Sequence, residues 1–150
     1  MQIATGKLEE ALANYGKALA VGEKLASIIE AAEIKSGGKA GRATASELGS
    51  VSWRALFARD YAKALSSADR ALSIAPGELW IVMNRAHALM LVGRIKEART
   101  LYLAHKDERL ANNANKLWQQ VVVEDFAELH KAGVTNRLMP KIEASLNAKK

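Results

Sequence analysis

An internal repeat constrains the fold of this 150-residue chain more than any other feature. When the sequence is shifted by 34 residues against itself, two neighbouring segments align. The aligned pairs are Arg59 with Gly93, Tyr61 with Ile95, Ala64 with Ala98, Ala68 with Tyr102 and Ala71 with His105. A recurrence of this period indicates stacked copies of one supersecondary unit.

The first half of the central unit, residues 45–58, predicts an amphipathic helix. Leu48, Val51 and Ala55 share one face. Thr44 is followed three residues later by Glu47, which predicts a capping box at the start of this helix. The shift of 34 residues places an equivalent helix over 79–92.

The second half of each unit predicts a partner helix. A turn at Arg59 and Asp60 leads into a stripe that ends at Ala75, because Pro76 disfavours helical geometry before it. In the next unit Gly93 is suited to a left-handed turn before the partner helix. The small residues Ala64 and Ala98 near the start of these helices predict a close approach of helix backbones.

This spacing resembles the tetratricopeptide repeat, a 34-residue helix-turn-helix with the pattern W-x2-L-G-x2-Y, then A-x3-F, then P. The second halves match best, at Ala64, Ala68, Ala71, Pro76, Ala98 and Tyr102. The first halves depart from the pattern, with Leu48 and Val82 at the tryptophan position, Ser52 and Ala86 at the glycine position and Arg85 at the leucine position. The resemblance implies an all-α solenoid of about seven helices.

The segments LSIAPGELW, NRAHALM and LYLAH are also similar to C-terminal repeat regions of some bacterial proteins that join such arrays to caspase-like peptidase domains. No peptidase chemistry follows for this chain, because that activity needs a cysteine and the sequence has none.

A third copy of the second half, beginning at Gly6, is displaced by 53 residues, so we expect an unusually long first helix. The expected organisation is one array: 1–34 the long second helix of a truncated repeat, 35–43 a loop, 44–76 and 78–106 two repeats, and 114–148 C-terminal capping helices. The polar run KDERLANNAN between the last repeat and the cap is expected to be irregular. Gly133 predicts the end of one capping helix, and Pro140 is tolerable in the first turn of the next.

The segment before Gly6 is too short for the helix that would pair with the first copy. We therefore expect the chain to be part of a longer array. An unpaired repeat leaves an apolar face uncovered, so we expect a homodimer through the N-terminal helix to be possible.

Composition argues against several other classes of function. The net charge is +6, but basic and acidic residues are interleaved along most of the chain, so we expect no nucleic-acid partner. The first residues do not form a signal peptide and no apolar run could span a bilayer, which predicts a soluble, cytoplasmic protein.

Catalytic and metal-binding patterns are also missing from the sequence. The histidines His87, His105 and His130 do not have metal-ligand spacing. The cluster of Glu124, Asp125 and Glu128 is typical of a solvated helix face. We expect no enzyme, no metal and no cofactor.

Recognition of a protein or peptide is the function that the resemblance implies. In tetratricopeptide arrays the first helices line a groove that holds a peptide or a partner helix. The resemblance places six candidate residues there: Trp53, Phe57, Trp80, Met83, Asn84 and His87. Two alternatives stay open: these side chains pack under the first helix or the cap, or the chain is a structural or self-association segment of a larger protein.

Overall fold

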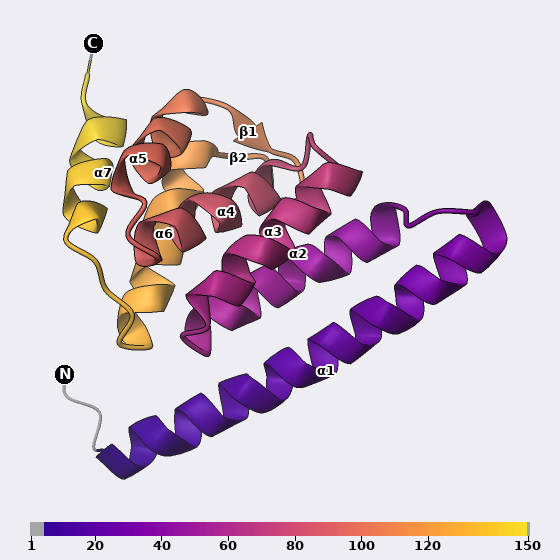
Figure 1. The fold of residues 1–150 in the computed structure, drawn as a ribbon. Helices are drawn as coiled ribbons and strands as arrows, with labels where there is room; N and C mark the ends of the chain where they lie inside the picture. The colour runs from indigo at the N-terminus through magenta and orange to yellow at the C-terminus, as the bar shows by residue number, and fades with distance from the viewer. Residues whose placement is uncertain (1–4, 150) are drawn as a thin grey trace.

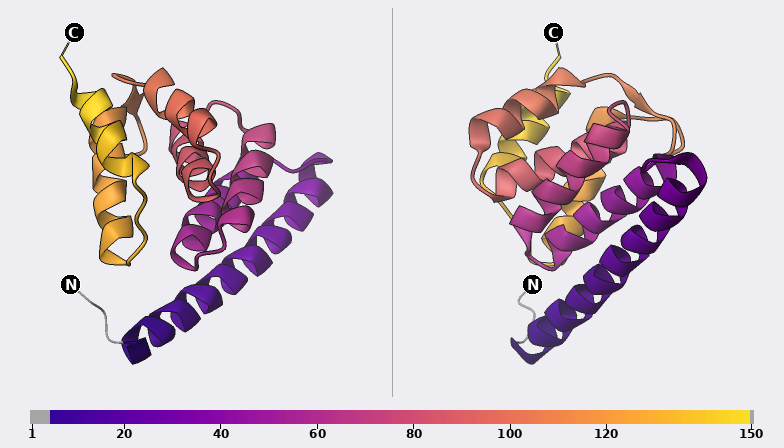
Figure 2. Two further views of the ribbon diagram at one scale, coloured as in Figure 1. Left: turned by 60° about the vertical axis from the view of Figure 1, so that its left-hand side comes forward. Right: turned by 45° about the vertical axis from the view of Figure 1, so that its right-hand side comes forward.

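The computed structural model describes residues 5–149 as a mostly helical domain in which consecutive helices pack on one another (Figure 1). This part of the chain has seven helices, and the first is 33 residues long, as expected. They are α1 (Thr5–Gly37), α2 (Arg42–Phe57), α3 (Tyr61–Ile74), α4 (Leu79–Leu91), α5 (Ile95–Ala104), α6 (Trp118–Lys131) and α7 (Leu138–Asn147). Figure 2 shows α1 at one end of the stack and α6 with α7 at the other.

The N-terminus of α2 is capped by a side chain of α1 and not by a residue of α2 itself. Thr44 lies inside the first turn and not before it, so the capping box predicted from Thr44 and Glu47 is wrong. Instead, the Glu33 carboxylate on α1 accepts a hydrogen bond from the Thr44 hydroxyl. It also accepts from the backbone N–H of Gly41 at 3.1 Å and from that of Thr44 at 2.7 Å. The hydrogen bond from the Thr44 side chain is the main reason that the pKa of Glu33 lies below its usual value.

The predicted turns between helices are confirmed. Arg59 has a positive φ of 60°, and Asp60 caps α3 by accepting the Lys63 N–H at 3.2 Å. Gly93, between α4 and α5, has a φ of 92°, a conformation in which a side chain is strained. Gly133 ends α6 in the same way, with a φ of 80°.

The recurring alanines lie where helices meet. Ala64, Ala68, Ala71 and Ala98 have no exposed surface. Ser52 on α2 donates its hydroxyl to the Ala64 carbonyl on α3 at 2.7 Å, a contact that needs a small residue at each position. The predicted close approach of helices is thus confirmed at Ala64, and Ala98 is buried in the main core.

The polar run after α5 is more ordered than the sequence suggested, and the chain is therefore not purely helical. Two short antiparallel strands, β1 (Arg109–Leu110) and β2 (Lys116–Leu117), pair Arg109 with Leu117 and Leu110 with Lys116. The Leu110 side chain is buried in the main core, and this burial fixes the hairpin against the helices. The hairpin sets where α6 begins.

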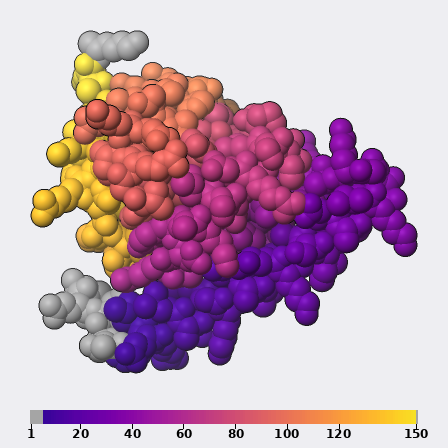
Figure 3. Space-filling model, viewed as in Figure 1, coloured from indigo at the N-terminus to yellow at the C-terminus, as the bar shows by residue number. Residues whose placement is uncertain are grey.

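Helix α1 lies at the edge of the molecule (Figure 3). It packs on α2 through Leu19 and Ala26, both buried. Its other side exposes Val21, Leu25 and Ile28 by 67%, 42% and 58%. None of the helices in the described residues is both long and apolar enough to cross a membrane.

Candidate functional site

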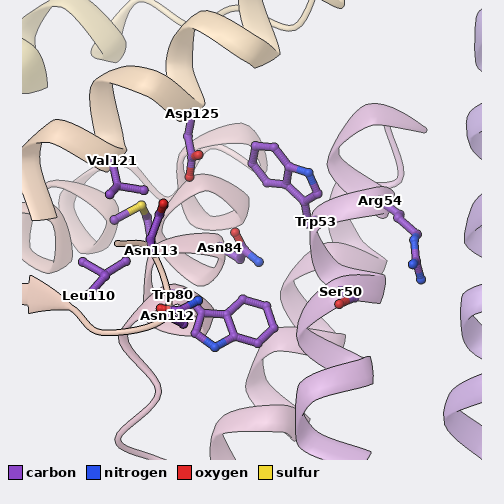
Figure 4. Close-up of a pocket in the computed structure, with 11 residues that line it drawn as sticks. Ser50, Trp53, Arg54, Trp80, Asn84, Leu110, Asn112, Asn113, Val121 and Asp125 are labelled. Atoms are coloured by element: carbon purple, nitrogen blue, oxygen red, sulfur yellow. The ribbon is translucent and has the colours of Figure 1, made fainter. Parts of the chain in front are cut away.

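One hollow in the structure is lined by elements that lie far apart in the sequence (Figure 4). It encloses about 280 Å³ between α2, α4, the β1–β2 hairpin and α6. We call it the indole cavity, after its two tryptophans. Its lining includes Trp53, Trp80, Met83, Asn84, Asn113 and Asp125.

Four of the six residues predicted for a binding groove line this cavity: Trp53, Trp80, Met83 and Asn84. Phe57 lies beside Trp53, with the ring centroids 4.8 Å apart and the rings nearly perpendicular. His87 is fully buried, because α6 covers this part of α4, and it has no surface to offer a ligand. Helix α6 thus covers His87, while Trp53 and Trp80 line the hollow.

The Trp80 wall of the cavity rests directly on the backbone of α2. A Cβ atom at Gly49 would lie 2.5 Å from Cη2 of Trp80 and 2.8 Å from Cγ1 of Ile81, so the two helices meet at a distance that only glycine allows. One turn further along α4, Asn84 donates from Nδ2 to the Gly49 carbonyl at 3.2 Å. These contacts hold the indole in one place.

The cavity also contains a carboxylate that is fixed by a buried hydrogen-bonded chain. Asp125, on α6, has its Oδ2 atom 2.9 Å from Nε2 of His87. Nδ1 of the same imidazole lies 2.6 Å from the hydroxyl of Tyr102, on α5. His87 and Tyr102 have no exposed surface, whereas the Asp125 side chain keeps 21% of its surface exposed.

The burial of Tyr102 keeps the proton on its phenol. Burial raises the pKa of the Tyr102 phenol well above its usual value, and the nearby Asp125 charge adds to the rise. The phenol therefore keeps its proton and forms a hydrogen bond with Nδ1 of His87. On the other side of the ring, Nε2 of His87 donates to Oδ2 of Asp125.

This arrangement orients the Asp125 carboxylate in the cavity. Both ring nitrogens of His87 are occupied, and neither is available to a substrate in the cavity. Within residues 5–149, no group of histidine and acidic side chains is arranged to hold a metal ion. The lining of the cavity includes two indoles, asparagine amides and one carboxylate.

Sequence reasoning missed Asp125, which it assigned to a solvated face together with Glu124 and Glu128. A signal was present, since Asp125 follows Trp118 and Val122 on the buried stripe of α6 and lies one position before Phe126. A carboxylate on an apolar stripe calls for a buried partner. No comparable signal marks Asn113, whose place depends on the hairpin.

Comparisons with protein-family models, with curated proteins and with solved structures found no match to this chain. The resemblance to the tetratricopeptide repeat therefore depends on the residues of the chain alone.

Proposed function

We propose that this chain is a non-catalytic, tetratricopeptide-like scaffold that binds a peptide or a partner helix across the indole cavity. The observation that carries the proposal is the convergence of two partly exposed indoles, Trp53 and Trp80, on one hollow built by four elements. Aromatic anchors in a pocket with a polar rim are the usual centre of protein recognition sites.

The arrangement of the helices supports the scaffold part of the proposal. Consecutive helices pack in order. Two features recur at equivalent places in the two helix pairs: a turn residue with positive φ, Arg59 and Gly93, and a buried alanine, Ala64 and Ala98. In helical repeat arrays such pairs present their first helices to a ligand. Here the first helices α2 and α4 carry the two tryptophans.

Peptide selection with a matched pair of variants tests this proposal. A random peptide library is selected on the wild-type chain, and binding of the enriched peptides is measured on Trp53→Ala and Leu103→Ala. Leu103 is 39% exposed on α5 and does not line the cavity, so its removal tests for nonspecific loss of apolar surface. We expect Trp53→Ala to weaken binding by about tenfold or more, as for an interface anchor. A library with no enriched peptide, or equal loss in both variants, would count against the proposal.

A second candidate function, self-association, is favoured by the outer side of α1. Val21, Leu25 and Ile28 are spaced as one helical stripe, and all three are exposed. A second copy of the chain could cover this stripe with its own. Light scattering at high protein concentration should then report a dimer that Leu25→Glu dissociates, and a wild-type monomer would contradict the idea.

A further inference from the structure

We infer that the indole cavity holds the cationic side chain, lysine or arginine, of a bound peptide. This inference rests on the proposed function and names the residue that the site selects. The observation behind it is the joint presence of a fixed carboxylate and two indole walls around one small hollow.

The carboxylate has one oxygen to offer. Oδ2 of Asp125 accepts the hydrogen bond from His87, and Oδ1 forms no hydrogen bond with another of the described residues. Figure 4 shows the Asp125 side chain directed toward the space between Trp53 and Asn84. An ammonium or guanidinium group in that space would supply donors to an oriented acceptor.

The charge of the cavity is negative although the chain as a whole carries +6. The one basic side chain in the lining, Arg54, places Nη1 2.9 Å from the Glu47 carboxylate. Figure 4 shows its guanidinium directed away from the cavity. Asp125 is thus the one charged side chain of the lining that is directed into the cavity. An anionic ligand would be repelled, and a neutral apolar one would remove water from the carboxylate without replacing its hydrogen bonds.

The indole walls suit the same ligand. A cation over the face of a tryptophan is attracted by the ring quadrupole, and tryptophan is the best of the aromatic residues for this contact. Phe57 holds Trp53 edge to face, and Gly49 lets Trp80 rest on the α2 backbone, so both rings are positioned before a ligand arrives. A volume of about 280 Å³ lies at the lower end for small-molecule sites and fits one side chain better than a larger ligand.

Tryptophan indole signals in NMR spectra test the inference directly. The ¹⁵N-labelled chain is titrated with N-acetyl-lysine amide and N-acetyl-arginine amide, and separately with the neutral analogues N-acetyl-norleucine amide and N-acetyl-citrulline amide. The third tryptophan, Trp118, is fully buried and donates its Nε1–H to the Tyr102 carbonyl, so its signal is an internal reference. We expect the Trp53 and Trp80 signals to move with the cationic compounds only, while the Trp118 signal stays in place.

Asp125→Asn is the matched variant, because the amide keeps the shape of the side chain and its oxygen still accepts the hydrogen bond from His87. We expect its affinity for the cationic compounds to fall about tenfold, a change easily measured in such a titration. An unchanged Trp118 signal shows that the variant is folded. If it is not folded, Trp53→Leu replaces it as the test of the aromatic wall.

Equal shifts with the neutral analogues, equal affinity in Asp125→Asn, or no shift with any compound would overturn the inference. These failures differ from failure of the proposed function. Selected peptides that bind through Trp53 but need no lysine or arginine would refute the cationic residue and leave peptide binding intact. Binding of the cationic compounds without any selected peptide would do the opposite.

Discussion

Replacing Gly49 by alanine tests the contact that positions the Trp80 wall. The added Cβ would lie 2.5 Å from Cη2 of Trp80, 2.8 Å from its Cζ3 and 2.8 Å from Cγ1 of the buried Ile81. These distances are too short for carbon atoms, so the Trp80 ring must swing out or α4 must move away from α2. Either movement disturbs the indole cavity.

Two opposing terms set the size of the effect on stability. Alanine is favoured over glycine in a helix interior by about 1 kcal/mol. Overpacking a helix contact costs about 1–3 kcal/mol, and loss of the hydrogen bond from Asn84 to the Gly49 carbonyl adds about 1 kcal/mol. We expect a net loss of about 1–3 kcal/mol in the free energy of unfolding of Gly49→Ala.

The chain contains its own control for this substitution. Gly16 lies in α1, and a Cβ there would meet nothing within 4 Å. The same change, Gly16→Ala, should therefore show the helix preference alone, a gain of about 0.5–1 kcal/mol. The two variants differ from wild type by the same atoms, so the difference between them isolates the packing at Trp80.

Urea unfolding followed by circular dichroism measures both variants. We expect the midpoints to move in opposite directions from wild type with an unchanged slope. Gly49→Ala should also weaken binding of any selected peptide, because its indole wall is displaced. Stabilisation of both variants by similar amounts would refute the claim that α2 and α4 meet at a glycine-only distance.

Three further predictions concern the packing and the buried polar groups. Ala68→Leu should lower the free energy of unfolding by about 1–3 kcal/mol through overpacking, whereas Ala62→Leu on the exposed side of the same helix should change it little. Tyr102→Phe should cost about 1–3 kcal/mol, because Nδ1 of His87 loses its buried hydrogen-bond partner; equal stability in urea would show that the hydrogen bond is not formed. Glu33→Gln should lower the melting temperature at neutral pH. Folding lowers the pKa of Glu33, so the Glu33 carboxylate stabilises the folded state at pH values above the ordinary glutamate pKa. This stabilisation disappears as the pH falls through the folded-state pKa. The melting temperatures of wild type and Glu33→Gln should therefore converge in acid.

The helices and turns of this chain could be predicted from local sequence because their causes are local. Gly93 and Gly133 end up in left-handed geometry, and the buried faces of the helices follow their apolar spacing. The capping box at Thr44 failed for the opposite reason. The groups that satisfy the start of α2 come from Glu33 on a different helix, and no pattern around Thr44 marks that partner.

In the candidate site, too, some features follow from local sequence and others from contacts between distant segments. The sequence alone determined that Trp53 and Trp80 lie on the first helices of two helix pairs, because a helical period fixes which residues share an element and a face. Only the tertiary structure decided that α6 covers His87 and brings Asp125 to the cavity. The position of α6 on α4 depends on the β1–β2 hairpin, which is anchored in the core by Leu110. The spacing of neighbouring residues does not predict contacts between segments so far apart in the sequence.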